Sequence, residues 1–466
     1  MGPSPSVVRL ESSWSFASRQ APARSIFLPG YKDTTRKVHG DHHKHEEVNL
    51  EDFYYGEGSL RCEDVALSEI AESIGTPTYV YSHDALEKAY REIDEAFSGL
   101  DHLVCYAVKA NGNLAVLRTL ASFGAGADIV SGGELYRVMK AGFDPKKVVF
   151  AGVGKTEDEL MAGLGERILL FNVESASELE HLRRFAALHG KKARVSLRVN
   201  PDVEPDTHAH ISTGQGGSKF GIPVDEALTL AERVREYRSL DLIGVHQHIG
   251  SQITKLAPYA ESIEKSAALV DELKRRGFDI RYFNIGGGLG IRYKDEEVPT
   301  PRELVDAVRP LLEATGVKIL CEMGRYIAGN AGVLLTQVIY RKRSGEKSFL
   351  VADAGMNDLL RPSLYDAHHE VRPINEGTTT ASADLVGPVC ESGDYLARDR
   401  VDLPDAAEGD LLALMSAGAY SFSMSSNYNS RPRPAEVLVR GDRWAVVRER
   451  ESYADLVRGE LIPAFL

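Results

Sequence analysis

Cysteine is scarce in this chain, and long apolar runs are missing from it. The 466 residues include four cysteines, Cys62, Cys105, Cys321 and Cys390, which lie far apart and in no spacing that suits a metal ion. This usage is typical of a reduced, intracellular protein rather than of one held by disulfides. No run approaches the roughly 20 apolar residues that a membrane span requires.

Positive charge is also in short supply. Lysine and arginine number 55 against 68 aspartate and glutamate residues, which gives a formal net charge of −13. We therefore expect no broad surface for nucleic acid or for an anionic membrane. With 43% hydrophobic and 26% charged residues, the chain is typical of a globular protein, and its length allows two domains. A cytoplasmic location is expected.

Residues 1–47 differ from the rest in having little periodicity and no apolar core like that of a secretory signal. We interpret them as a disordered extension, or as the product of a start codon placed too far upstream. Arginines among serines leave a transit peptide open, which would place the protein in an organelle. The histidines of Asp41–Glu47 could bind metal adventitiously. We assign no function to this segment.

A regular alternation of strand and helix patterns begins near residue 103. Eight apolar runs rich in β-branched residues predict strands at 103–108, 126–130, 148–151, 168–173, 195–199, 242–245, 282–285 and 319–321. Helical patterns lie between them at 115–123, 133–141, 176–188, 224–235, 259–276 and 301–314. The alternation predicts a (β/α)8 barrel of the TIM type, with an open doubly wound sheet as the alternative.

Polar or glycine residues follow nearly every predicted strand, and this favours the barrel. They are Lys109, Ser131, Gly132, Gly152, Glu174, Asn200, His246, His248, Gly286–Gly288 and Glu322. Barrel enzymes build their active sites from side chains at the carboxyl ends of the strands. A site at this end of the barrel is therefore expected.

The segments flanking the barrel predict a second, mainly β domain. Beyond Arg325, strand-like runs occur at 332–341, 348–353, 410–415, 435–440 and 443–447. The predicted organisation is a segment at 48–82 that contributes strands to the β domain, a barrel over 83–325, and the β domain over 326–466. A helix at 85–97, capped by Ser82 or Asp84, begins the barrel region.

The first candidate site residue is Lys109, which ends the run 103–108 just before the turn signal Asn111–Gly112. A buried lysine readily loses its proton, which makes the amine a nucleophile or a Schiff-base former. The alternative is a strand-end lysine that reaches past the edge to water.

The second candidate is the glycine-rich sequence NIGGGLG at 284–290, after the seventh predicted strand. Consecutive glycines let backbone N–H groups surround a phosphate, which is a common ligand near this strand of a barrel. Ile291 occupies the third glycine position of a G-x-G-x-x-G motif, so a dinucleotide interpretation is weak. A glycine-rich turn without a ligand remains open.

Two further strand ends carry side chains that suit a cofactor. His248 can lie against a flat ring and Ser251 can hold a phosphate oxygen, whereas a zinc pair of His246 and His248 lacks a third ligand. We interpret His246 as a hydrogen-bonded core histidine. Glu322 can keep a ring nitrogen protonated, and Arg325 offers a planar fork to a carboxylate or phosphate, unless the two form an ordinary surface pair.

A lysine, a phosphate cradle, a stacking histidine and a glutamate at barrel strand ends are together what pyridoxal 5′-phosphate requires. No metal is expected.

The chain resembles the diaminopimelate decarboxylases, pyridoxal-phosphate enzymes of fold type III with an alanine-racemase-like barrel and a β domain. The motifs that carry the resemblance are YAVKAN at 106–111, HIGSQ at 248–252, GGGLG at 286–290, EMGR at 322–325, MNDLLRP at 356–362, CESGD at 390–394 and SNYNSRP at 426–432. It extends from about residue 50 to the C-terminus. Met323 stands where the family usually has proline, a change expected to alter the turn slightly.

The resemblance implies which residues contact the cofactor. They are Lys109, His248, Ser251, Gly286, Gly287, Gly288, Glu322, Gly324, Arg325 and Tyr428. Lys109 would hold the cofactor covalently and act in catalysis, His248 would stack on the pyridine ring, and Glu322 would face the ring nitrogen. Ser251 and the glycines would bind the phosphate.

The resemblance also implies a substrate pocket shared by the two subunits of a homodimer. The implied substrate-binding residues are Arg325, Arg361, Tyr365, Glu391 and Tyr428. Cys390 and Glu391 would enter from the other subunit, with Cys390 as the catalytic proton donor to the substrate carbon. As alternatives, Cys390 is a small buried hydrophobe and Arg361 a loop arginine paired with Asp358 or Asp366. We interpret His368 and His369 as structural or surface residues.

The resulting prediction is a carboxy-lyase that converts meso-2,6-diaminopimelate, an amino-acid substrate, to L-lysine and CO2 in the last step of lysine biosynthesis. The distal end of this substrate needs cations for its carboxylate and an acid for its amine, which Arg325, Arg361 and Glu391 can supply. The alternatives are a decarboxylase of ornithine, arginine or carboxynorspermidine, a non-catalytic regulatory relative, and a racemase on the same fold. Arg361 and Glu391 argue against a decarboxylase of another substrate, and Lys109 and Cys390 argue against a non-catalytic relative. A racemase would offer a base on the second face, such as a tyrosine, in place of Cys390.

Overall fold

The computed structural model describes residues 52–203 and 219–466. The expectations for residues 1–47 lie outside this described part. Within it, no helix is both long and apolar enough to cross a membrane.

Eight parallel strands close into a barrel, so the predicted TIM-type fold is confirmed and the open sheet is excluded. In order around the barrel they are β5 (His102–Ala107), β6 (Gly126–Ile129), β7 (Val148–Phe150), β8 (Leu170–Val173), β9 (Ala193–Asn200), β11 (Leu240–Gln247), β12 (Tyr282–Asn284) and β13 (Lys318–Met323). β13 pairs with β5 and so completes the ring. A short strand, β10 (Ile222–Pro223), extends β9 on one side.

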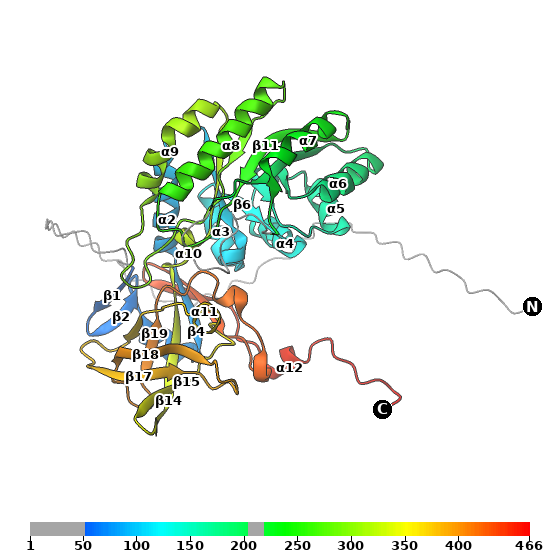
Figure 1. Ribbon diagram of the computed structural model, residues 1–466. Helices are drawn as coiled ribbons and strands as arrows, with labels where there is room; N and C mark the ends of the chain where they lie inside the picture. Colours follow the sequence, from blue (N-terminus) through cyan, green and yellow to red (C-terminus); the bar gives the residue numbers. More distant parts are fainter. Residues whose placement is uncertain (1–51, 204–218) are drawn as a thin grey trace, which may run out of the picture. The chain divides into compact units, whose positions relative to one another are not determined.

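Helices between the strands cover the outside of the barrel (Figure 1). They are α2 (His83–Ala96), α3 (Leu114–Ser122), α4 (Gly132–Ala141), α5 (Glu157–Glu166), α6 (Ala176–Leu188), α7 (Val224–Arg235), α8 (Ala257–Arg275) and α9 (Pro301–Thr315). Ser82 caps α2, because its Oγ accepts the backbone N–H of Ala85 at 2.9 Å. The sequence analysis missed α5, which buries only Leu160, Gly163 and Leu164 and has a weak apolar stripe.

The second domain is a β structure assembled around the long strand β14 (Gly332–Ser344). Its other strands are β4 (Thr78–Ser82), β15 (Lys347–Ala352), β16 (Val371–Pro373), β17 (Thr380–Val386), β18 (Tyr395–Pro404), β19 (Leu411–Leu414), β20 (Ala435–Arg440) and β21 (Arg443–Arg448). β4 lies between β14 and β20, so a strand that precedes the barrel in sequence completes the sheet that follows it. Figure 1 shows this blue strand among yellow and orange ones.

Shorter elements complete the chain. β1 (Phe53–Gly56), β2 (Ser59–Cys62) and β3 (Val65–Ala66) form a small sheet, followed by α1 (Leu67–Ile74). Short helices are α10 (Arg325–Ala328), α11 (Arg361–Tyr365) and α12 (Tyr453–Leu456). The first two carry arginines that matter for the site.

The β domain touches the barrel at the carboxyl ends of the strands. The backbone N–H of Tyr420 donates to Ala110 O at 2.8 Å, and Asn111 Nδ2 donates to Gly418 O at 3.1 Å. The approach at Gly418 is very close, because a Cβ added there would lie 1.8 Å from Ala328 O. These contacts fix the β domain beside the strand ends that were predicted to form the site.

A methyl group at this junction should therefore destabilise the fold. We expect Gly418→Ala to lower the free energy of unfolding by about 1–3 kcal/mol, the usual range for overpacking. The control is Gly165→Ala inside α5, where an added Cβ meets nothing within 4 Å; it should stabilise by about 0.5–1 kcal/mol. Urea unfolding measures the free energy of unfolding of both variants. An unchanged value in Gly418→Ala would contradict the tight junction.

Candidate active site

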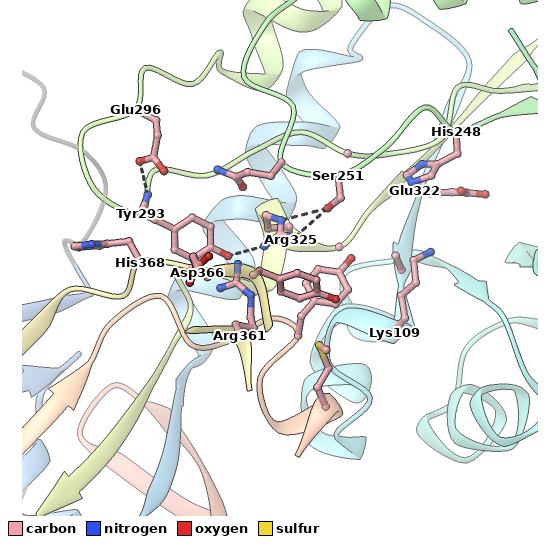
Figure 2. Close-up of a pocket in the computed structure, with 18 residues that line it drawn as sticks. Lys109, His248, Ser251, Tyr293, Glu296, Glu322, Arg325, Arg361, Asp366 and His368 are labelled. Carbon is pink, nitrogen blue, oxygen red and sulfur yellow. Dashed lines mark hydrogen bonds between the residues drawn. The ribbon is translucent and has the colours of Figure 1, made fainter. Parts of the chain in front are cut away.

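A cavity of about 440 Å³ lies where the strand ends of the barrel meet the β domain. The predicted site residues that line it are Lys109, His248, Ser251, Gly288, Glu322, Gly324, Arg325, Arg361 and Tyr365. Figure 2 shows Lys109, His248 and Glu322 at one end and Tyr293 and Asp366 at the other. The cavity is therefore elongated, with chemically different ends.

Lys109 lies in a 3-10 turn directly after β5, and its Nζ donates to Asp128 Oδ2 at 2.7 Å. The sequence analysis expected burial to remove the proton from this amine, and that expectation is wrong. Burial does lower the pKa of Lys109, but the charge of Asp128 outweighs it and raises the pKa above its usual value. Lys109 therefore stands as an ammonium group paired with a carboxylate.

Asp128, on β6, is a site residue that the sequence analysis missed. Its side chain is fully buried, and burial together with the charge of Glu322 raises its pKa to about 6. Its Oδ1 has no hydrogen-bond partner among the described residues. A charged residue inside the apolar run 126–130 was the signal that could have revealed it.

Glu322 is held by side chains from three other strands of the barrel, β8, β11 and β12. Its Oε1 accepts hydrogen bonds from Asn284 Nδ2 at 2.7 Å and Asn172 Nδ2 at 3.4 Å, and His246 Nε2 lies 3.2 Å from Oε2. Burial raises the pKa of Glu322, but the interactions with His246 and Lys109 lower it by more. The pKa of Glu322 therefore lies well below its usual range. The carboxylate is thus ionised and fixed in direction. His246 is a hydrogen-bonded core histidine as expected, and its partner is this carboxylate.

His248 presents a neutral ring to the cavity. Its Nδ1 accepts the backbone N–H of Gly287 at 3.1 Å, which fixes the ring plane. Burial and the charges of Arg198 and Lys109 lower the pKa of His248 well below its usual value. A neutral imidazole with a fixed plane is suited to stacking against a flat ring, and it does not act as a cationic hydrogen-bond donor.

The glycine turn is required by close packing. Gly286 and Gly288 have φ of +72° and +106°, and a Cβ on Gly287 would lie 1.9 Å from Glu322 O. The N–H groups of Gly286 and Gly287 donate to Asn284 Oδ1 and His248 Nδ1, so a phosphate contact by these two groups stays a prediction. Gly288 lines the cavity.

Two guanidinium groups, Arg325 and Arg361, are buried between the domains without an ion pair to any described residue. Arg325 donates to Tyr293 Oη at 2.6 Å and to Ser251 Oγ at 3.1 and 3.3 Å. Arg361 lies over the Tyr293 ring at 4.6 Å from its centroid, and Arg325 over the Tyr420 ring at 4.9 Å. A buried charge without a countercharge is costly, so this arrangement requires an anionic ligand.

These contacts overturn the two structural alternatives for the arginines. Arg325 does not form a surface pair with Glu322, because both are buried and each has other partners. Arg361 is paired with neither Asp358 nor Asp366; Asp358 instead accepts the backbone N–H of Gly355. Tyr293 and Tyr420 were missed, since no pattern in the sequence marks these two loop tyrosines as neighbours of an arginine.

His369 connects Arg361 to the end of β19. Its Nε2 lies 3.0 Å from Arg361 Nη1 and its Nδ1 lies 2.8 Å from Met415 O. A carbonyl can only accept, so Nδ1 carries the hydrogen and Nε2 accepts from the arginine. The surface interpretation of His369 is therefore wrong, since its exposed fraction is 1%. His368 lines the cavity and lies 3.3 Å from Arg400 Nη1.

Cys390, Glu391 and Tyr428 are exposed and are not among the residues that line the cavity. Cys390 lies in the loop between β17 and β18, and its backbone N–H donates to Asn429 Oδ1 at 2.7 Å, beside Tyr428. The alternative of Cys390 as a buried hydrophobe is wrong. A thiol, a carboxylate and a phenol that were predicted to act in a site thus lie on the surface of this chain.

Comparison with known proteins agrees with this geometry. Residues 83–329 match the family model described as pyridoxal-dependent decarboxylase, pyridoxal binding domain. Diaminopimelate decarboxylase of Pseudomonas aeruginosa is 52% identical over 416 residues, covering 89% of this chain and 100% of that protein. The enzyme of Aquifex aeolicus is 49% identical over 409 residues, covering 87% and 97%. The chain belongs to the diaminopimelate decarboxylase family.

Solved structures of the family have the same fold. The Helicobacter pylori enzyme complexed with L-lysine has a TM-score of 0.82 and 42% identity, and covers 84% of this chain and 98% of its own. The M. jannaschii enzyme in complex with L-lysine has a TM-score of 0.85 and 38% identity, and covers 90% and 99%.

Pyridoxal phosphate, the cofactor of this family, fits the residues of the cavity. Lys109 offers an amine, His248 offers a flat neutral face, and the ionised Glu322 offers a partner for a protonated ring nitrogen. Ser251 and Arg325, which are hydrogen-bonded to each other, offer hydroxyl and guanidinium donors to a phosphate.

The buried His369 should give this decarboxylase fold a measurable dependence on acid. Burial and the charge of Arg361 lower the pKa of His369 from 6.5 to about 3. Between these values the unfolded chain binds a proton that the folded chain does not, so stability rises with pH, by up to about 1.4 kcal/mol per pH unit. Urea unfolding gives the free energy of unfolding at each pH. Between about pH 5 and 6.5, this free energy should rise less steeply with pH in His369→Phe than in the wild type, by up to this amount. An unchanged slope would contradict a neutral, buried His369.

Proposed function

We propose that this protein converts meso-2,6-diaminopimelate to L-lysine and CO2, the last step of lysine biosynthesis. The observation that carries the proposal is the pair of buried guanidinium groups, Arg325 and Arg361, without a carboxylate partner in the described part of the chain. Diaminopimelate bears an amino-acid group at each end, so it brings a carboxylate to these arginines while its other end reacts. Ornithine and arginine have no distal carboxylate and would leave Arg361 without an anionic partner.

At the reacting end, the chain supplies charge and orientation. Pyridoxal phosphate, when bound, supplies an electron sink for the electron pair left on the substrate carbon as CO2 departs. Lys109 would hold the cofactor covalently through Nζ, and Asp128 Oδ2, which accepts a hydrogen bond from Nζ at 2.7 Å, orients this amine. Glu322 would keep the ring nitrogen protonated, because its own carboxylate stays ionised. His248 would lie against the ring.

At the distal end, the chain supplies cations. Arg361, with Arg325 and Tyr365 beside it in the cavity wall, binds the distal carboxylate. Ser251, which is hydrogen-bonded to Arg325, and Gly288 line the cavity and would bind the phosphate. The arginines are fixed by neutral contacts, so their full charge is available to the ligand.

We further propose a homodimer in the cytoplasm, with a site completed by the partner. Cys390, Glu391 and Tyr428 are exposed together at the surface of one chain, as residues that enter a second subunit's cavity would be. Cys390 Sγ would then donate a proton to the substrate carbon, and Glu391 would accept a hydrogen bond from the distal ammonium.

A substrate comparison tests the proposed function. Purified, pyridoxal-phosphate-loaded protein is given meso-diaminopimelate, L-ornithine or L-arginine separately, and CO2 and the amine product are measured. We expect turnover of diaminopimelate alone, with L-lysine as product. Turnover of ornithine or arginine would contradict the distal carboxylate site, and no turnover with intact cofactor absorbance would point to a regulatory relative.

A mixing experiment tests the shared site. Lys109→Ala and Cys390→Ala should each be inactive or strongly impaired, with kcat of the cysteine variant down by about 100-fold or more for loss of a proton donor. Mixing the two variants under conditions that exchange subunits should restore activity, because a hybrid dimer has one site with both residues intact. Activity that does not recover, despite demonstrated hybrid formation, would mean that Lys109 and Cys390 act within one chain.

A further inference from the structure

The guanidinium of Arg361 is held by the neutral imidazole of His369, which is itself held by Met415 from a different part of the β domain. Arg361 begins α11, whereas Met415, which holds His369, directly follows β19. His369 Nδ1 donates to Met415 O at 2.8 Å, and Arg361 Nη1 donates to His369 Nε2 at 3.0 Å. Arg361 and His369 are 6% and 1% exposed, so water does not replace either contact.

The aromatic ring of Tyr293 closes the other side of this arrangement. It packs edge-on against His369, with centroids 5.6 Å apart and an interplanar angle of 77°, and the guanidinium of Arg361 lies 4.6 Å above it. The Tyr293 hydroxyl accepts from Arg325 at 2.6 Å. Both arginines therefore contact Tyr293. Ser251 and Tyr293 hold Arg325, whereas His369 holds Arg361.

An imidazole has a property here that a carboxylate would lack. A guanidinium has five N–H donors and no acceptor, so its direction is set by the groups that accept from it. A carboxylate in the place of His369 would fix Arg361 equally well, but it would neutralise the charge and compete with an anionic ligand. A neutral acceptor orients the fork and leaves its charge for the ligand.

We infer that His369 is a positioning residue that directs Arg361 toward the distal carboxylate of the substrate and so gives the cavity its preference for ligands that carry this group. The inference rests on the proposed function, because it assigns the ligand of Arg361. A histidine that only filled the core would affect all ligands of the cavity alike.

Two ligands that differ in the distal carboxylate test the inference. L-Lysine keeps that carboxylate, whereas cadaverine is the same diamine without it. Calorimetric titration of the holoenzyme with each ligand gives the ratio of the two dissociation constants, which is a measure of binding and not of turnover. In His369→Phe we expect L-lysine to bind about tenfold or more weakly, as for the loss of a hydrogen bond to a charged group, with little change for cadaverine.

Matched variants separate orientation from packing. His369→Asn keeps a donor for Met415 O but is too short to accept from Arg361, and should behave like His369→Phe; it also serves if the phenylalanine variant does not fold. His369→Gln has a longer side chain with an acceptor oxygen and should recover part of the preference. The control is His102→Gln, at the start of β5, whose Nδ1 also lies 2.9 Å from a backbone carbonyl, that of Leu100. It should leave both affinities unchanged.

Kinetics give a second, independent readout. With meso-diaminopimelate, His369→Phe should raise KM by about tenfold or more while kcat changes little, because the reacting end is untouched.

The outcomes distinguish this inference from the function on which it rests. If the wild-type holoenzyme binds L-lysine no better than cadaverine, both the proposed function and the inference are overturned. If the wild type prefers L-lysine and His369→Phe and His369→Asn keep that preference, or lose both ligands equally, the inference alone is overturned.

Discussion

Two positive charges buried without a countercharge are the constraint on which the rest of this site depends. Arg325 comes from the barrel and Arg361 from the β domain, and the described contacts that hold them are neutral: two hydroxyls, an imidazole and two tyrosine rings. Such contacts reduce the cost of burial without cancelling the charge. The arrangement exists only because the two domains meet closely at the strand ends, as at Gly418.

The other end of the cavity has the opposite electrostatic design. Lys109 is paired with Asp128, and Glu322 accepts hydrogen bonds from two asparagines and lies 3.2 Å from His246 Nε2, so the charged groups there have polar partners within the chain. A cofactor with a protonated ring nitrogen meets a carboxylate at this end. The substrate thus spans a cavity whose charged groups have partners within the chain at the reacting end and lack a countercharge at the distal end, which explains why a second carboxylate decides the substrate.

The sequence predicted the site residues that depend on strand ends, but it did not predict which side chains of different elements contact each other. Parallel strands bring their carboxyl ends together, so Lys109, His248 and Glu322 could be assigned to one cavity from their positions alone. The role of His369 could not be predicted from the sequence, because its contact with Arg361 depends on how β19 lies relative to α11. The pKa of Lys109 was predicted with the wrong sign, since its partner on β6 was not recognised. Strands β16, β17 and β18 were also missed, and much of β18 is exposed and lacks an apolar alternation.

The most direct measurement compares meso-diaminopimelate with D-lysine, which has the same reacting centre but no distal carboxylate, in the wild type and in Arg361→Met. The ratio of the two kcat/KM values reports the contribution of the distal carboxylate alone. The account predicts a strong wild-type preference for diaminopimelate that Arg361→Met largely removes, by lowering kcat/KM for diaminopimelate and not for D-lysine. A preference that survives in Arg361→Met would contradict it.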